Sequence, residues 1–146
     1  MSQINSFLDL DVYKEAFAVQ QRIFELSKKW PAEERFSLTS QIRRSSRSVG
    51  SNLAEAWAKR RYPAHFVSKL TDADGERQET EHWILTVEAC QYEPQSETRE
   101  LRDSITGIGR RIGRMIDKHA SFCLCVHETN GQSYLTSDHC PPTSDL

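Results

Sequence analysis

The stretch that decides the fold class is QIRRSSRSVGSNLAEAWAKRR, residues 41–61. Its apolar side chains recur at helical spacing, at Ile42, Val49, Leu53 and Ala56, and this period predicts an amphipathic α-helix. Serine, glycine and alanine fill much of the remainder. Short side chains let a neighbouring helix approach closely, although they lower intrinsic helix stability. We therefore expect this helix to pack closely against other helices.

Three further segments on either side of this stretch show the same period. The four predicted helices cover about residues 9–30, 37–62, 63–92 and 96–118. Ser37 is a suitable N-cap residue for the second helix, and Pro31, Pro63 and Pro94 fall at helix boundaries. Helices of similar length joined by short links favour antiparallel neighbours. The predicted fold class is all-α, an antiparallel up-and-down four-helix bundle formed by residues 1–118.

Each predicted helix has one face that we assign to the core. On the first helix this face comprises Tyr13, Ala16, Phe17, Gln20, Ile23, Phe24 and Ser27, with Trp30 at its end. The third and fourth helices carry apolar stripes from Phe66 to Val87 and from Leu101 to Ile116.

Residues 119–146 lose the helical period and gain turn residues, so we predict a poorly ordered C-terminal tail. The tail contains residue types that bind zinc, at His119, Cys123, Cys125, His127, His139 and Cys140. However, its Cys-x-Cys spacing is shorter than the usual spacing of structural zinc ligands. We therefore prefer an unstructured tail to a metal site, and predict neither a metal nor a cofactor.

The overall composition excludes some classes of protein. A formal net charge of −2 gives the chain no general attraction to polyanions, so any such binding must come from a local patch. The N-terminal residues lack the pattern of a secretory signal. The longest apolar run, residues 122–126, is too short to span a bilayer. We expect a soluble, cytoplasmic protein without membrane association.

The arginines of the second predicted helix are candidate nucleic-acid contacts. Arg43, Arg47 and Arg61 fall on one sector of the helical wheel, and Arg44 lies beside it. Guanidinium groups offer fork geometry to phosphate oxygens. The competing interpretation is helix pairing, because residues 41–61 balance at +5 and residues 69–93 at −5. Helices of opposite charge can pair within a subunit or between subunits.

Two other motifs could suggest chemistry. Asn52 and Glu55 stand three residues apart, but no second carboxylate or histidine at a telling spacing supports acid–base catalysis. We predict instead a polar pair that sets helix packing or a subunit interface, and no enzymatic activity. GIGRRIG at residues 107–113 lacks the strand that precedes a phosphate-binding loop, so we assign its glycines to close helix packing.

Two stretches of the chain resemble one known family. Residues 41–61, followed by FVSKLTDADGERQETEHWI at 66–84, are similar to the bacterial ribosomal RNA intervening-sequence proteins. Residues 41–44 match the family's Q-I-R-R element and residues 52–55 its N-[IL]-A-E element. The third element, a Phe-led helix with an A-x-G-x-x-x-E core, matches at Phe66, Leu70, Ala73, Gly75 and Glu79.

The resemblance extends from FLDLDVYKEA at residues 7–16 to about residue 118. Ala56 departs from the pattern, since glycine is usual there, and the tail has no counterpart. The resemblance implies an antiparallel four-helix bundle that assembles into a homopentamer. A related branch comprises accessory proteins of diversity-generating retroelements, which partner reverse transcriptase and nucleic acid. Most members of the family have no established biochemical activity, so the resemblance implies no reaction.

From the sequence we therefore predict a non-enzymatic oligomeric bundle that serves as a scaffold for RNA or DNA. Its candidate contacts are Arg43, Arg44, Arg47 and Arg61. The alternative is a protein–protein interaction oligomer whose basic and acidic helices pair with each other or with a partner, without a nucleic-acid role.

Overall fold

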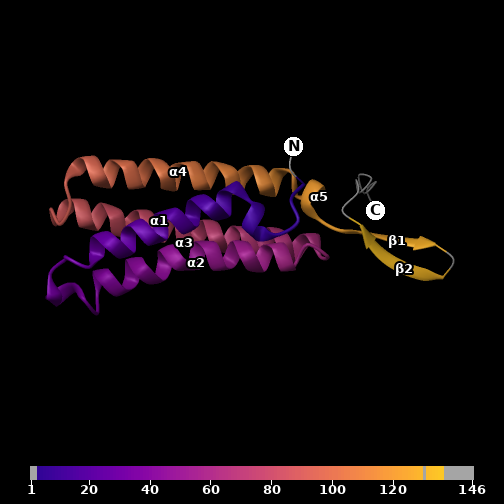
Figure 1. Ribbon diagram of the computed structural model, residues 1–146, viewed down its shortest axis with the longest axis horizontal. Coiled ribbons are helices and arrows are strands. Elements are labelled where there is room, and N and C mark those ends of the chain that lie inside the picture. The colour runs from indigo at the N-terminus through magenta and orange to yellow at the C-terminus, as the bar shows by residue number, and fades with distance from the viewer. Residues whose placement is uncertain (1–2, 130, 137–146) are drawn as a thin grey trace.

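The computed structural model describes residues 3–129 and 131–136, and four long helices dominate it (Figure 1). They are α1 (Asp11–Ser27), α2 (Leu38–Ala58), α3 (Pro63–Ala89) and α4 (Gln95–Asp117). The shorter elements are η1 (Phe7–Asp9), η2 (Ala32–Glu34), α5 (His119–Phe122), β1 (Cys125–Thr129) and β2 (Gln132–Thr136). The predicted all-α up-and-down bundle is confirmed.

The long helices form a closed ring of neighbours. Each one contacts the next along the chain, and α1 also contacts α4, so that α2 and α4 lie diagonally across the bundle. The α1–α2 and α3–α4 links lie together at one end, while the α2–α3 link and α5 lie at the other (Figure 1). None of the helices in the described part of the chain has both the length and the apolar character needed to cross a membrane.

The start of α2 is capped differently from the prediction. Ser37 precedes the helix, but its side chain makes no cap hydrogen bond to the helix backbone. Its hydroxyl instead donates to Glu34 Oε2 at 2.6 Å, and the same carboxylate oxygen accepts the Leu38 amide at 3.3 Å. Glu34 thus satisfies a free amide of the first turn and holds the residues between η2 and α2.

The end of α3 has a Schellman-type cap. Gln91 adopts φ of +58°, the left-handed region, and its amide donates to the Glu88 carbonyl at 3.1 Å. The following amide, of Tyr92, donates to the Val87 carbonyl at 3.1 Å, which is the second bond of the motif. The chain therefore turns sharply into α4 without a glycine.

The buried face of α1 is rotated from the predicted one. The buried residues are Val12, Ala16, Val19, Ile23, Leu26 and Ser27. Phe17 is instead 47% exposed, and Tyr13, Gln20 and Phe24 are half-buried. Part of this aromatic face meets α2, because a Cβ on Gly50 would lie 3.5 Å from Tyr13 Cε2. The ring-bearing side of α1 thus lies toward α2, and the aliphatic side enters the core.

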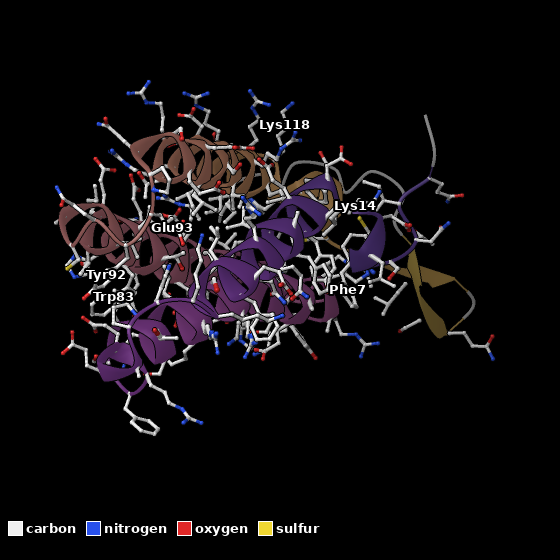
Figure 2. The ribbon with its side chains drawn as sticks, turned by 60° about the vertical axis from the view of Figure 1, so that its left-hand side comes forward. Phe7, Lys14, Trp83, Tyr92, Glu93 and Lys118 are labelled. Atoms are coloured by element: carbon white, nitrogen blue, oxygen red, sulfur yellow. The ribbon has the colours of Figure 1, made fainter. Side chains whose placement is uncertain are left out.

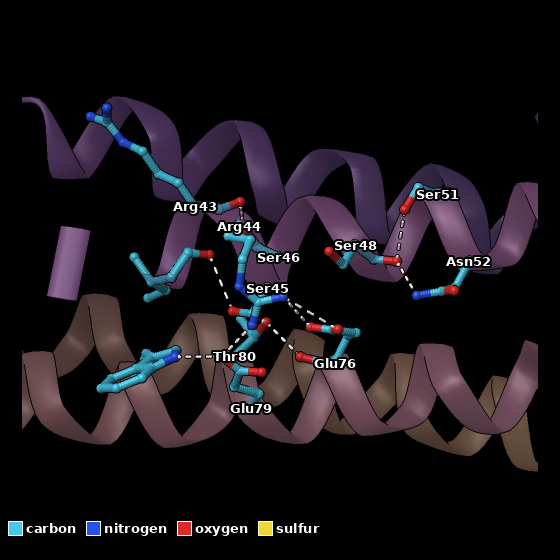
Figure 3. A network of polar contacts seen from close by, with 12 residues as sticks. Arg43, Arg44, Ser45, Ser46, Ser48, Ser51, Asn52, Glu76, Glu79 and Thr80 are labelled. Atoms are coloured by element: carbon cyan, nitrogen blue, oxygen red, sulfur yellow. Dashed lines mark hydrogen bonds and ion pairs between the residues drawn. The ribbon is translucent and has the colours of Figure 1, made fainter. Parts of the chain in front are cut away.

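The other predicted stripes form the core, except that Met115 is buried near the end of α4 and Ile116 is only half-buried. Phe66, Leu70, Ala73, Thr80, Ile84 and Val87 are buried on α3, and Leu101, Ile105, Ile108 and Ile112 are buried on α4. Two polar links cross this core. The hydroxyl groups of Thr80 and Ser45 lie 2.9 Å apart between α3 and α2 (Figure 3). Trp30 Nε1 donates to the buried Glu93 carboxylate at 2.7 Å, at the end of the bundle where Figure 2 labels Tyr92 and Glu93.

Two of the three glycines in GIGRRIG mark close approaches between helices. A Cβ on Gly107 would lie 3.0 Å from Glu15 Oε1 of α1. A Cβ on Gly109 would lie 2.8 Å from Nε of Arg77 on α3. No atom lies within 4 Å of the corresponding position on Gly113. The predicted role in helix packing holds for the first two glycines.

The segment after α4 differs from the predicted unstructured tail. Residues 119–122 form α5, and β1 and β2 pair as an antiparallel hairpin in which Cys125 is opposite Thr136. The Leu124 amide donates to the Arg60 carbonyl at 3.0 Å, which ties the segment to the α2–α3 link. The loss of the helical period after residue 118 correctly marked the end of the bundle, but it did not predict a hairpin. For residues 137–146 the prediction lies outside the described residues.

Candidate functional site

Arg43 and Arg44 are neighbours in sequence but lie on opposite flanks of α2. Arg43 reaches toward α1, where its Nε donates to Ser27 Oγ at 2.7 Å and its guanidinium lies 4.9 Å from the centre of the Phe24 ring. Arg44 reaches toward α3, where it pairs with Glu76 at 3.3 Å and with Glu79 (Figure 3). The predicted cluster is therefore divided.

Arg47 lies with Arg43 on the α1 flank. It is exposed, and its guanidinium lies 5.4 Å from the centre of the Phe24 ring. Lys28 Nζ lies 4.7 Å from the same ring centre. Cations within about 6 Å of an aromatic ring are attracted to its face. Phe24 thus gathers three cations beside α2 and restricts their orientation.

Arg61 does not lie on α2, contrary to the prediction. The helix ends at Ala58, and Arg61 lies in the turn before α3, where it is exposed. Tyr62 takes an extended conformation with φ −121° and ψ 100°, because the residue before a proline, here Pro63, avoids the helical region. Arg61 is therefore at the far end of α2 from Arg43 and Arg47.

The structure adds Arg35 and Phe36, which sequence analysis missed. Both lie between η2 and α2, and Phe36 is 87% exposed. The Arg35 guanidinium lies 5.4 Å from the centre of the Phe36 ring. The one sequence signal that could have identified them was their position shortly before three arginines of α2. The exposure of a side chain in a short link cannot be predicted from a helical period.

Glu34 holds the segment that carries Phe36. Besides Ser37 and Leu38, it accepts a hydrogen bond of 3.0 Å from the Tyr92 hydroxyl. The hydrogen bonds from Ser37, Tyr92 and the Leu38 amide lower the pKa of Glu34. The same carboxylate and partial burial raise the pKa of Tyr92 to about 12. The link before α2 is thus fastened to the end of α3.

These residues surround an open hollow of about 650 Å³ on the outer side of α2, which we call the basic groove. It is lined by Arg35, Phe36, Thr39, Ser40, Arg43, Arg44, Arg47, Ser48 and Ser51. A second hollow of about 330 Å³ shares Arg35, Thr39 and Arg43 with it and extends to Lys28. Four arginines and no carboxylate line the basic groove, so it is a local cationic surface on an acidic chain.

The carboxylates on α3 neutralise the Arg44 side of the groove. Hydrogen bonding from Arg44 lowers the pKa of Glu79, with a further contribution from Trp83. The same pair raises the pKa of Arg44. The predicted pairing of basic and acidic helices therefore exists within one chain, at this arginine.

Asn52 and Glu55 meet through Lys69 of α3. Lys69 Nζ lies 2.8 Å from Glu55 Oε2 and 3.4 Å from Asn52 Oδ1. Asn52 Nδ2 also donates to the Ser48 carbonyl at 2.9 Å. Hydrogen bonding and charge lower the pKa of Glu55 and raise that of Lys69. In this chain the pair contacts the neighbouring helix.

A second group of cations lies on α4, at Arg110, Arg111, Arg114 and Lys118. Arg111 pairs with Glu15 at 3.0 Å. The hollow beside it, of about 470 Å³, is lined by Asp9 and Asp11 as well as Arg111 and Arg114. With Lys14 this lining has three cations and two carboxylates, so charge there is largely compensated, in contrast to the basic groove.

The tail histidines and cysteines were named above as residue types that bind zinc, but no metal site was predicted there. Among the residues that the structure describes, no group of three or more His, Cys, Asp or Glu side chains is arranged to hold a metal ion. His139 and Cys140 lie outside the described residues.

The fold and groove together define a class, an all-α four-helix bundle with a basic groove along α2. The chain matches the family model of the 23S rRNA-intervening sequence proteins over residues 8–114, and it belongs to this family. The resemblance noted in the sequence is thereby confirmed. No curated protein matches the chain.

The chain is also similar to a solved structure, the 1.70 Å crystal structure of a protein of unknown function from the S23 ribosomal protein family of Bacteroides thetaiotaomicron VPI-5482. The two chains are 28% identical, with a TM-score of 0.66. The similarity covers 73% of this chain and 95% of the other.

Proposed function

We propose that this protein is a non-enzymatic, self-associating scaffold that binds nucleic acid through the basic groove. The observation that carries the proposal is the α1 flank of the groove. Within the described residues, Arg44 is ion-paired with carboxylates, whereas Arg35, Arg43 and Arg47 are not. Uncompensated arginines lining one groove are the electrostatic footprint of a phosphate-binding surface.

The local contacts prepare these arginines for phosphate. Arg43 is fixed by Ser27 and Phe24, which leaves its terminal nitrogens to form charge-assisted bonds. Arg47 follows one helical turn later, about 6 Å along the axis. Both side chains are restricted before a ligand arrives, which reduces the entropy lost on binding.

Two further considerations favour nucleic acid as the polyanion. The net charge of −2 gives the chain no general attraction to polyanions, so binding must come from a local patch such as the basic groove. The description of the family to which the chain belongs names 23S rRNA. We extend that association to this chain as RNA binding. We further propose cytoplasmic location and assembly as a homopentamer, on the resemblance given above.

The proposal is tested by binding across a salt series. Labelled RNA is titrated with wild type and with the double variant Arg43→Gln/Arg47→Gln, while light scattering tracks the oligomer mass. We expect weaker binding and a salt slope that becomes shallower by about 0.7 per lost phosphate contact on single strands, or about 0.9 on B-form DNA. The double variant Arg99→Gln/Arg110→Gln removes the same two charges from exposed positions on the diagonal helix α4 and serves as control.

A second candidate function is supported by a specific observation. Arg44 and Lys69 form ion pairs between α2 and α3, so the charged helices can act as pairing surfaces in a protein–protein interaction oligomer. That function is favoured if wild type shows no salt-dependent nucleic-acid binding and the double arginine variant changes oligomer mass. Retained mass with lost binding favours the first proposal.

A further inference from the structure

We propose that the basic groove takes single-stranded nucleic acid, with an unpaired base stacked on Phe36 and the neighbouring phosphates on Arg35, Arg43 and Arg47. This inference rests on the proposed function and names its ligand class. It depends on one juxtaposition, a highly exposed aromatic ring in the same groove as the uncompensated arginines.

The exposure of Phe36 is unusual for its residue type. At 87% exposed, it is the most exposed of the large apolar side chains that are open to solvent in the described residues. Phenylalanine gains free energy when its ring is removed from water. A ring that is 87% exposed, with the Arg35 guanidinium 5.4 Å from its centre, has the form of a stacking platform, since every base has a π-face to cover it.

The ring is attached to an ordered segment. Glu34, directly before Arg35, accepts hydrogen bonds from Ser37, Leu38 and Tyr92. The two residues between these anchors are Arg35 and Phe36. The backbone that carries the ring is thus fixed on both sides, so that stacking would not require an otherwise flexible loop to become ordered.

The groove gives a strand a path beyond the ring. From Thr39 to Ser51 the lining follows α2 for about 18 Å. Arg43 and Arg47 are successive along this path, with the Ser40 hydroxyl before them and the Ser48 and Ser51 hydroxyls after them. Phosphates can therefore lie over α2 while the base at one end covers Phe36.

A duplex does not fit this arrangement equally well. Bases in a duplex are stacked on one another and their faces are covered, whereas bases in a single strand can be splayed out onto aromatic side chains. A duplex would contact the arginines but leave Phe36 without a partner. The combination of ring and arginines therefore favours a single strand.

The experiment compares a 12-nucleotide oligouridine with a 12-base-pair RNA duplex, for wild type and Phe36→Leu at several salt concentrations. We expect Phe36→Leu to weaken oligouridine binding roughly 5- to 150-fold, the range for loss of one stacked base. The salt slope should stay unchanged, because no phosphate contact is removed. Duplex binding should change by less than about twofold.

Two further variants make the result specific. Phe36→Tyr keeps an aromatic ring and should retain oligouridine binding. Tyr62→Leu removes an exposed ring, 56% exposed, at the other end of α2 and should have no effect. Circular dichroism and light scattering report whether each variant keeps its fold and its mass.

The outcomes separate this inference from the proposed function. If Phe36→Leu leaves oligouridine binding intact while Arg43→Gln/Arg47→Gln weakens it, the stacking inference is wrong and the proposed function stands. If wild type binds neither RNA in a salt-dependent manner, both are wrong. If Phe36→Leu changes the oligomer mass, Phe36 is a contact between subunits and the inference is overturned.

Discussion

The two flanks of α2 carry similar arginines in different surroundings. On the α3 flank, Arg44 pairs with Glu76 and Glu79. On the α1 flank, Arg43 and Arg47 lie against the Phe24 ring and a serine hydroxyl. The first flank neutralises charge and joins two helices, whereas the second orients charge and leaves it uncompensated. Arginines that are adjacent in sequence can therefore have different roles, because consecutive residues of a helix are rotated by about 100° and face different neighbours.

The largest expected effect contrasts the buried and outer faces of α2. Ser45 is 0% exposed and bonded to Thr80, so Ser45→Leu should destabilise the fold by about 1–3 kcal/mol through overpacking. Ser51→Leu, on an exposed position of the groove, should change stability by about 0.5 kcal/mol or less. Urea denaturation measures both. Equal losses would contradict the distinction between the two faces.

The next effect distinguishes the two flanks, because a variant on one flank should weaken RNA binding and a variant on the other should lower stability. Arg47→Gln should make the salt slope of single-strand binding shallower by about 0.7 with little loss of stability. Arg44→Gln should lose about 0.5–1 kcal/mol of stability at low salt, because its partly exposed ion pairs are screened. Denaturation at two salt concentrations and RNA titration of both variants test this. A larger binding loss for Arg44→Gln than for Arg47→Gln would reverse our assignment of the flanks.

A smaller effect tests how closely the α1 flank is packed. A Cβ on Gly50 would make ordinary contacts, 3.5 Å to Tyr13 Cε2 and 3.7 Å to Gln20 Oε1. Gly50→Ala should therefore stabilise the protein by about 0.5–1 kcal/mol, from helix propensity. Gly75→Ala on α3, where the new methyl meets nothing within 4 Å, is the matched reference. A thermal melt in which only the Gly50 variant loses stability would show that α1 and α2 pack more tightly than described.

The smallest effect is a pH dependence confined to the α3 flank. Hydrogen bonding to Arg44 lowers the pKa of Glu79 in the folded protein. Its contribution to stability is therefore present above the unfolded-state pKa, about 4.3, and is lost as the pH falls through the folded value. Glu79→Gln should show a shallower loss of stability below about pH 5 than wild type. Identical acid limbs would mean that the pair contributes nothing measurable.

The helices could be predicted from sequence because two independent signals agree. Apolar residues recur with a period of 3.6, and Pro31, Pro63 and Pro94 mark the boundaries. The buried face of α1 could not be predicted as well. Its aromatic and aliphatic residues both follow a helical period, and only contact with α2 decides that Phe17 stays exposed while Val19 is buried.

The candidate site was predicted only in part. Arg43, Arg44 and Arg47 were recognised from charge, but their partners come from helices far away in sequence. Arg35 and Phe36 were missed because they lie in a link, where no period reports orientation. The β-hairpin was missed because its ten paired residues carry too little pattern to distinguish strands from a polar tail.

Gly109 has a consequence for how related sequences can vary. The Arg77 side chain lies against this glycine while it pairs with Asp74 at 2.6 Å and Glu81 at 3.3 Å on its own helix, so a Cβ at position 109 would displace it. Substitution at one position thus alters the selective pressure on the other. Among relatives, sequences with a side chain at position 109 should carry a shorter residue at position 77, so that these two positions, 32 apart in the chain, evolve as one unit.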